Sequence, residues 1–317
     1  MFRHCTNIDY SRNILPTLEA QSVQCVVTSP PYYNLRDYGV NMQIGQEATY
    51  QEYIDTLVSV FREVRRVLKD DGTVWLNLGD SYAGSGQGGN LDKNKKLKSM
   101  TPLKQTPLAG LKKKDLIGIP WRVAFALQQD GWYLRQDIIW YKPNVMPESV
   151  KDRCVKSHEY IFLLSKNKNY YFDYKAIKED SVLFESYKEH GYKRTLNAAH
   201  PSYNLRRDDK RDSMKQTYPQ KRLNRKDSDY DITKRNKRDV WTIPTHPYKG
   251  AHFAAFPLKL VIPCILAGSR EGDVILDPFF GSGTVAEAAA LLNRNWLGID
   301  INPDYEPLYK ERLALFA

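Results

Sequence analysis

Two short segments of this chain combine residue types that could bind a ligand or do chemistry. Near the C-terminus an apolar run leads into Asp277-Pro278-Phe279-Phe280-Gly281-Ser282-Gly283-Thr284, which holds an acid and two glycines. Glycines between a strand and a helix let the backbone pass close to a ligand and direct free N–H groups at it. Asp300 ends the next apolar run, 23 positions after Asp277, where a carboxylate can accept hydrogen bonds from two ribose hydroxyls. This spacing indicates a site for a nucleoside cofactor.

The composition of the glycine turn narrows the class of ligand. It lacks the full GxGxxG pattern of dinucleotide sites and the lysine of a phosphate-binding P-loop, so NAD and ATP fit it less well. A glycine turn can also serve close packing alone. The acid at the end of the following strand is what favours a ligand site.

The second segment is Thr28-Ser29-Pro30-Pro31-Tyr32, which follows the apolar run 23–27. Consecutive prolines fix the backbone and contribute no N–H donors, so the turn is rigid and presents carbonyl oxygens. Taken alone, such a segment could be only a turn after a strand. Its occurrence in one chain with the glycine turn favours an active site.

Together the two segments resemble the motifs of S-adenosylmethionine-dependent DNA amino-methyltransferases. Residues 277–284 are similar to the DPFxGSGT cofactor motif, and residues 29–32 are similar to the catalytic (S/D/N)PP(Y/F) motif. The catalytic motif comes first, which is the order of the β class. The resemblance extends over 25–80, 119–166 and 240–305, about two thirds of the chain. It implies an α/β, Rossmann-like methyltransferase fold in permuted order, S-adenosylmethionine as cofactor and double-stranded DNA as substrate.

The resemblance implies methyl transfer to the exocyclic amino nitrogen of a base flipped out of the duplex. Such an amino group is a poor nucleophile because its lone pair is delocalised into the ring. Ser29 Oγ and the Pro30 carbonyl could accept its hydrogens and localise that lone pair, while Pro31 helps to keep the turn rigid. Tyr32 offers a flat face for the base. Positioning would contribute most of the catalysis, with no metal or covalent intermediate required.

The target base is expected to be cytosine, methylated at N4. Ser29 and the continuation Leu35-Arg36-Asp37-Tyr38-Gly39 resemble the N4-cytosine enzymes. Tyr33-Asn34 replaces the Trp-Gly of that variant, at positions expected nearest the base. The N6 nitrogen of adenine stays open as the alternative target, because both amino groups need the same acceptors. Asn34, Arg36, Asp37 and Tyr38 are candidates for contacts with the base or with phosphates.

The resemblance also implies further contacts with the cofactor. The stretch from His252 and Phe253 to Pro257 matches a second cofactor-contacting segment of the family. Ile8-Asp9 stands where the family has Gly-Asp, so Asp9 is a candidate for a contact with the adenine of the cofactor. The expected cofactor residues are Asp9, Thr28, His252, Phe253, Asp277, Pro278, Phe279, Gly281, Ser282, Gly283, Thr284 and Asp300.

Alternating strands and helices must position these motifs. Apolar periodicity predicts strands at 23–27, 74–78, 137–141, 160–164, 274–276 and 296–300. It predicts helices from Ile54 to a stop at Asp71-Gly72, from Pro120 to Gly131, over 257–268 and over 285–292. Asp80 could line the catalytic cleft or cap a turn through Ser81, and the pattern leaves both interpretations open.

Three parts of the chain are distinguished by composition. Residues 1–166 form the expected catalytic half, with a lysine-rich mobile loop at 83–115 that either closes over DNA or is a solvated insertion. Residues 167–239 lie where the family has its target-recognition region. Residues 240–317 form the expected cofactor-binding half.

The net charge of +10 and the pI near 9.2 indicate an acidic partner. Fifteen Lys or Arg against six Asp give the segment 193–238 a net charge of +9, nearly all of the excess. Over residues 167–239 basic side chains alternate with tyrosines, a mixture suited to phosphates and base faces: Tyr192, Tyr203, Tyr218 and Tyr230. A basic disordered stretch without a specific partner is the alternative.

Other features restrict the class of protein. The sequence has no apolar run long enough for a membrane span and no secretory leader, so a cytoplasmic monomer or homodimer without a membrane partner is expected. The four scattered cysteines predict neither a zinc site nor disulfides. A cognate restriction endonuclease is a possible partner.

Three other functions are supported less well by the sequence than DNA amino-methylation. Pro263-Cys264 could suit a cytosine-C5 enzyme, but it lies in an apolar run and a Glu-Asn-Val partner is absent. Protein-glutamine methyltransferases carry Asn-Pro-Pro-Tyr after the glycine turn rather than before it. A DNA-binding protein without catalysis is the third, and the intact motifs disfavour it.

Overall fold

The structure is a computed structural model that describes residues 4–35, 38–40, 42–84, 110–181, 234–245 and 257–316. Contacts divide the chain into one unit of residues 1–176 and 238–317 and a second of residues 177–237. The expectations for Arg36, Asp37, His252 and Phe253 fall outside the described residues, as do those for most of the 83–115 loop and of the basic segment.

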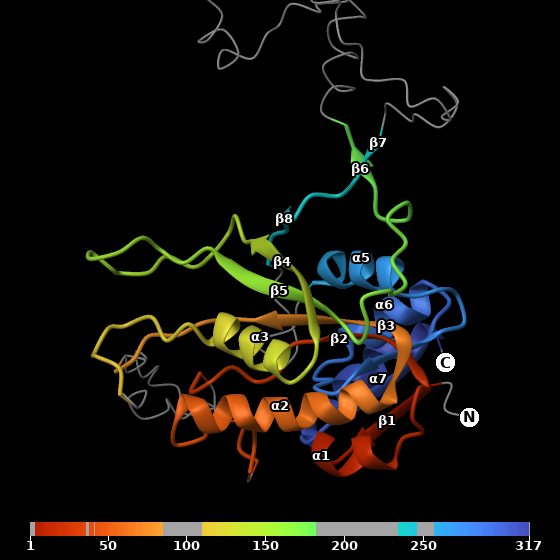
Figure 1. Ribbon diagram of the computed structural model, residues 1–317, viewed down its shortest axis with the longest axis horizontal. Helices are drawn as coiled ribbons and strands as arrows, with labels where there is room; N and C mark the ends of the chain where they lie inside the picture. The colour runs from red at the N-terminus through yellow and green to blue at the C-terminus, as the bar shows by residue number, and fades with distance from the viewer. Residues whose placement is uncertain are drawn as a thin grey trace, which may run out of the picture. The chain divides into compact units, whose positions relative to one another are not determined.

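The larger unit is built on an eight-stranded sheet (Figure 1). Its order is β1 (His4–Ile8), β10 (Asn295–Asp300), β9 (Val274–Asp277), β2 (Val23–Thr28), β3 (Leu68–Leu78), β5 (His158–Ser165), β4 (Tyr133–Tyr141) and β8 (Val240–Thr242). Neighbouring strands are parallel except that β5 is antiparallel to β3 and to β4. The α/β, Rossmann-like fold expected from the sequence is therefore confirmed, and strands from the C-terminal part of the chain lie beside the strand that carries the catalytic turn.

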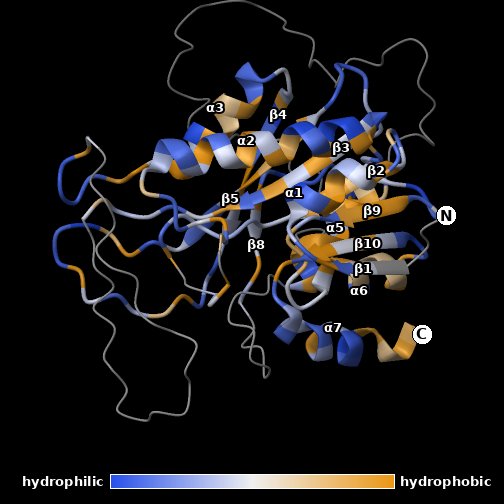
Figure 2. Cartoon of the chain, turned by 90° about the horizontal axis from the view of Figure 1, so that it is seen from below, coloured by the Kyte–Doolittle hydropathy of each residue, from blue (hydrophilic) through white to orange (hydrophobic). Residues whose placement is uncertain are grey.

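Helices cover both faces of this sheet, as the arrangement of the elements in Figure 2 shows. One face carries α1 (Ser11–Ile14), α2 (Tyr50–Val67) and α3 (Ile119–Gln129), and the other carries α5 (Leu258–Gly268), α6 (Thr284–Leu291) and α7 (Glu306–Leu313). Short 3-10 turns lie at Leu15–Thr17, Pro303–Tyr305 and Ala314–Phe316. In the described residues no helix is long and apolar enough to cross a membrane.

The apolar stripe expected around Ile54 does form one face of α2. Leu57, Phe61 and Val64 are fully buried in the core under the sheet. The helix begins with a reciprocal cap, because Thr49 Oγ1 accepts from Glu52 N–H and the Glu52 carboxylate accepts from Thr49 N–H. The core around α2 therefore anchors the strands that carry the catalytic turn.

The predicted end of α2 at Asp71-Gly72 is wrong. The helix ends at Val67, and Leu68 is already extended and paired with Val23 of β2. The pairing shifts register before Thr73, and Gly72 permits the close approach that this requires. A Cβ atom at Gly72 would lie 2.9 Å from the carbonyl oxygen of Gln24.

Cys264 lies in the core, as expected from the apolar run around it. It is 2 % exposed, and its thiol donates to the Leu260 carbonyl one turn earlier in α5. It is not on the wall of the cavity described below. The interpretation of Pro263-Cys264 as a packing element is therefore supported over that of an attacking nucleophile.

Asp80 acts as a cap, in a way that the sequence only half predicts. Its carboxylate accepts from Ser81 N–H at 2.9 Å and from the N–H groups of Gly118 and Ile119 at 3.0 Å each. It therefore caps α3, which starts nearly forty positions later. Burial raises the pKa of this carboxyl above its ordinary value, while the N–H donors and Lys156 oppose that shift.

The second unit contains one described element of secondary structure. Strands β6 (Glu179–Asp180) and β7 (Lys234–Arg235) form an antiparallel pair. Each basic residue of β7 forms an ion pair with an acid of β6, at 2.5 Å and 2.9 Å. Because the side chains of Lys234 and Asp180 are well exposed, that pair adds little stability, whereas Arg235 and Glu179 are partly buried.

Replacing Asp80 with Ala should lower the free energy of unfolding by about 2 kcal/mol, because three N–H groups around the start of α3 lose their acceptor. Urea unfolding measures the loss. Asp55→Ala on the exposed face of α2 is the matched control and should change stability by less than about 0.5 kcal/mol. Unchanged stability of the Asp80 variant would contradict the capping role.

Candidate active site

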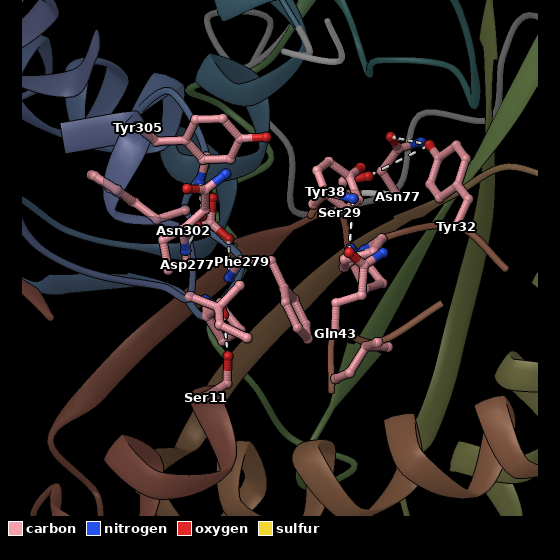
Figure 3. Close-up of a pocket in the computed structure, with 18 of the residues that line it drawn as sticks. Ser11, Ser29, Tyr32, Tyr38, Gln43, Asn77, Asp277, Phe279, Asn302 and Tyr305 are labelled. Atoms are coloured by element: carbon pink, nitrogen blue, oxygen red, sulfur yellow. Dashed lines mark hydrogen bonds between the residues drawn. The ribbon is translucent and has the colours of Figure 1, made fainter. Parts of the chain in front are cut away.

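One cavity of about 320 Å³ opens at the carboxyl ends of β2, β9 and β10. Ligands bind at this edge in parallel α/β sheets because the loops that follow the strands converge there. Figure 3 shows its residues in two groups, with Asp277, Asn302 and Tyr305 in one and Ser29, Tyr32 and Asn77 in the other. Residues from both predicted motifs thus share one cavity.

A buried hydrogen bond joins the two motifs. Thr28 is the last residue of β2, Asp277 is the last residue of β9, and these strands are parallel neighbours. Thr28 Oγ1 donates to Asp277 Oδ1 at 2.6 Å, with Thr28 fully buried and Asp277 2 % exposed. Thr28 does not line the cavity and is joined to it through Asp277, so its role at the cofactor stays a prediction.

Two buried carboxylates line the part of the cavity next to the glycine turn. Burial raises the pKa of Asp277 to about 7, although hydrogen bonds from Thr28 and from Phe279 N–H oppose the shift. Burial also raises the pKa of Asp300, which accepts from Gly281 N–H at 2.6 Å and from Asn302 N–H at 2.8 Å. A positively charged ligand would offset the cost of burying these acids.

The glycine turn owes its shape to two left-handed residues. Gly281 has φ +53° and Gly283, the N-cap of α6, has φ +78°. A Cβ atom at Gly283 would lie 2.8 Å from Tyr309 Cβ, so this glycine also serves packing. Gly283 does not line the cavity, whereas Gly281, Ser282 and Thr284 do.

The two phenylalanines of the turn have different environments. Phe280 is 3 % exposed and stacks on Trp296 with ring centroids 5.7 Å apart. Gly298 leaves room for it, since a Cβ atom there would lie 2.3 Å from the Phe280 ring. Both rings line the cavity, but Phe279 is only partly buried and has more surface available to a ligand than Phe280.

The N-terminal segment contributes residues next to Asp9 rather than Asp9 itself. Tyr10, Ser11 and Arg12 line the cavity, and Ser11 Oγ donates to the Pro278 carbonyl. The Asp9 carboxylate accepts from Tyr10 N–H and from Asn13 Nδ2, which ties it to the start of α1. A role of Asp9 at the adenine stays a prediction.

The catalytic turn is held from several sides. Ser29, Pro30, Pro31 and Tyr32 all line the cavity, and the Tyr53 hydroxyl donates to the Pro31 carbonyl at 2.8 Å. The Tyr32 ring is packed tightly against Gly79 at the end of β3, where a Cβ atom would lie 2.4 Å from the ring. The turn is therefore rigid, as the consecutive prolines predict.

Three polar residues beside Tyr32 are not predicted by the sequence. The Tyr32 hydroxyl lies 2.7 Å from Glu159 Oε2 and 3.1 Å from Asn77 Oδ1, and Lys142 forms an ion pair with Glu159. Asn77 interrupts the otherwise apolar run 74–78, which is a signal that could have been noticed. Glu159 and Lys142 carry no comparable local signal. They meet because β4 and β5 are antiparallel neighbours.

Tyr33 is not where the sequence analysis expected it. It is 1 % exposed, packs on Tyr53 with ring centroids 5.5 Å apart, and is absent from the cavity wall, as is Asn34. The departure from Trp-Gly at these two positions therefore does not lie on the cavity wall. Leu35 and Tyr38 line the cavity instead.

Comparison with known proteins identifies the family. A family model described as DNA methylase, covering N6 and N4 enzymes, matches residues 23–311. The Type II methyltransferase M.SmaI of Serratia marcescens is 47% identical over 304 residues, 96% of this chain and 88% of that protein. M.Cfr9I of Citrobacter freundii is 44% identical over 95% of this chain and 84% of its own length. The chain belongs to the N6/N4 DNA methylase family, which confirms the resemblance to S-adenosylmethionine-dependent DNA amino-methyltransferases.

Solved structures agree on the fold. The cytosine-N4-specific PvuII DNA methyltransferase superposes with a TM-score of 0.63 at 18% identity, over 98% of this chain and 86% of that one. A Thermus thermophilus protein assigned as a DNA modification methylase, in complex with S-adenosyl-L-methionine, gives 0.58 at 24% identity, over 98% and 93%. Both share the methyltransferase fold with this chain.

The raised pKa of Asp277 predicts a pH-dependent loss of stability. Unfolded Asp277 ionises near 3.8, whereas the folded carboxyl keeps its proton until about 7. Stability should therefore fall as pH rises between these values, by on the order of 4 kcal/mol from this group.

Asp277→Asn cannot ionise and still offers Thr28 an acceptor, so this part of the pH dependence should disappear in the variant. Denaturant unfolding of both proteins between about pH 4 and pH 8 checks it. A stability difference between variant and wild type that is constant across this range would contradict the prediction.

Proposed function

We propose that the protein transfers a methyl group from S-adenosylmethionine to N4 of cytosine in double-stranded DNA. One observation carries this proposal: the Ser29–Tyr32 turn and the Asp277–Thr284 turn line the same cavity, with Thr28 bonded to Asp277 between them. A methyl donor held by one turn would face an amino group held by the other. Methyl transfer requires this juxtaposition.

The residues on the cofactor side suit S-adenosylmethionine. The cavity is of a size that holds a small ligand. In the described part of the chain, the hydrogen bonds to Asp277 and Asp300 come from a hydroxyl and from backbone N–H groups, all uncharged. A cationic ligand would compensate both acids, and Phe279 and Tyr305 offer aromatic surface. When bound, the cofactor supplies the activated methyl group.

The residues on the catalytic side activate the amino nitrogen. Ser29 Oγ and the Pro30 carbonyl accept its hydrogens, which localises the nitrogen lone pair towards the methyl donor. Because Tyr53 holds the Pro31 carbonyl, the turn keeps this geometry without reorganisation. Tyr32 forms part of the wall against which the flipped base lies.

Cytosine is favoured over adenine by the first position of the catalytic motif. Ser29 matches the N4-cytosine type of motif, and the structurally similar PvuII enzyme is named as cytosine-N4-specific. N6 methylation of adenine is the second candidate, because the same two acceptors would activate either amino group.

DNA recognition is assigned to residues 167–239. The net charge of +9 over residues 193–238 favours the phosphate backbone through counterion release. Relatives such as M.SmaI are named as Type II methyltransferases, so we also propose a cognate restriction endonuclease as a partner.

The purified protein, incubated with S-adenosylmethionine and unmethylated genomic DNA, should produce N4-methylcytosine. Digestion to nucleosides and mass spectrometry identify the product. N6-methyladenine would retain the mechanism and overturn the assignment of the base. Absence of any methylated nucleoside would contradict the proposed activity and favour a binding protein.

Ser29→Ala should reduce methyl transfer by about 100-fold or more, because the amino group loses one of its two acceptors. Single-turnover assays measure the rate, and isothermal titration measures cofactor affinity, which should stay unchanged. Asp55→Ala, on the exposed face of α2 and outside the cavity wall, serves as the control and should be fully active. Full activity of the Ser29 variant would contradict the role of this hydroxyl as an acceptor for the amino group.

Asp300→Ala should lower the affinity for the cofactor more than it lowers the rate of methyl transfer. Loss of hydrogen bonds to a charged acceptor should weaken S-adenosylmethionine binding by about 10- to 100-fold. Titration calorimetry gives the affinity, and the transfer rate at saturating cofactor should fall less than the affinity does. Normal affinity would count against a contact between Asp300 and the ribose.

A further inference from the structure

The hydroxyl of Tyr32 connects the catalytic serine with a charged pair. Ser29 Oγ lies 3.5 Å from the Tyr32 oxygen, and Glu159 Oε2 lies 2.7 Å from it on β5. Lys142, just after β4, forms an ion pair with the other oxygen of Glu159. Glu159 and Lys142 have side chains only 16% exposed, and both line the cavity.

Hydrogen-bond chemistry gives this chain of groups a direction. The Tyr32 hydroxyl has one proton and two neighbouring acceptors, Glu159 Oε2 at 2.7 Å and Asn77 Oδ1 at 3.1 Å. The carboxylate, which is closer and paired with Lys142, is the stronger acceptor, so the proton goes to Glu159. Burial, with the Glu159 charge as a second cause, holds the pKa of Tyr32 well above its usual range, so the hydroxyl remains a donor.

This direction determines how Ser29 is oriented. Because the Tyr32 hydroxyl donates its proton to Glu159, its oxygen can only accept a hydrogen bond from Ser29 Oγ–H. The serine lone pairs then point away from Tyr32 and remain free for an N–H group in the cavity. Asn77 cannot compete for the tyrosine by rotating its amide, since its Nδ2 group donates to the Tyr160 carbonyl at 3.1 Å.

We propose that Glu159, held by Lys142, is a positioning residue that acts through Tyr32 to orient the Ser29 hydroxyl and to take up the proton released by methyl transfer. This inference rests on the proposed function. It assigns to β4 and β5 a part in catalysis that the two sequence motifs do not contain.

The proton balance of the transfer step agrees with this assignment. The nitrogen gains a bond to the methyl carbon, the bond from that carbon to sulfur breaks, and sulfur keeps the electron pair. The nitrogen must then lose one of its two protons. That proton passes to Ser29 Oγ, the serine proton passes to Tyr32, and the tyrosine proton passes to Glu159, which becomes neutral beside Lys142.

Glu159→Gln tests the proposal in the full-length protein with S-adenosylmethionine and DNA. The amide oxygen is a weaker acceptor and cannot take up the proton, so the single-turnover rate should fall by about 10- to 100-fold. Cofactor affinity and the KM for DNA should be unchanged. Glu159→Asp keeps the carboxylate and should recover part of the rate. Glu311→Gln, on the exposed part of α7, is the matched control and should be fully active.

A double-variant cycle separates this role from a structural one. Tyr32→Phe removes the connection, so adding Glu159→Gln to it should slow the reaction no further. The proposal would be overturned if the double variant lost the product of the two single-variant rate losses. A wild-type rate in Glu159→Gln would overturn it as well. A Glu159 variant with altered cofactor affinity would also overturn it, because the effect would then not be confined to the transfer step. An inactive wild-type protein would instead contradict the proposed function itself.

Discussion

The active site depends on one constraint: an aspartate must be buried at the point where two parallel strands end side by side. Asp277 is 2 % exposed, and leaving its carboxyl without partners there would be costly. The Thr28 hydroxyl on the adjacent strand supplies a hydrogen bond, and that same strand continues directly into Ser29. Compensation of the buried acid therefore also sets the separation between the catalytic turn and the cofactor turn.

The order of strands follows from this constraint. β9 and β10 come from the C-terminal part of the chain, yet they lie between β1 and β2. Since the sheet edge at the carboxyl ends of parallel strands is shared, residues more than two hundred positions apart reach one cavity. The motifs can thus exchange their order in the chain without changing the site, because the sheet and not the sequence brings them together.

The two sides of the cavity differ in their electrostatics. On the cofactor side, Asp277 and Asp300 are buried acids with uncharged hydrogen-bond donors, an environment that a cation would stabilise. On the catalytic side, Glu159 already has its cation in Lys142 and takes a hydrogen bond from Tyr32. The first arrangement suits binding of a positively charged ligand, and the second suits orientation of neutral groups and removal of a proton.

The sequence by itself determined the α/β class, the two turns, their order and the part of the cavity wall that the turns form, because these depend on periodicity and on neighbours a few positions apart. Only the tertiary structure decided that Asp80 caps α3, that Tyr33 is buried, and that Glu159 meets Tyr32. The last contact spans 127 positions and exists because β5 reverses direction between β3 and β4. Pairings of this kind depend on strand order, which no local pattern of residues encodes.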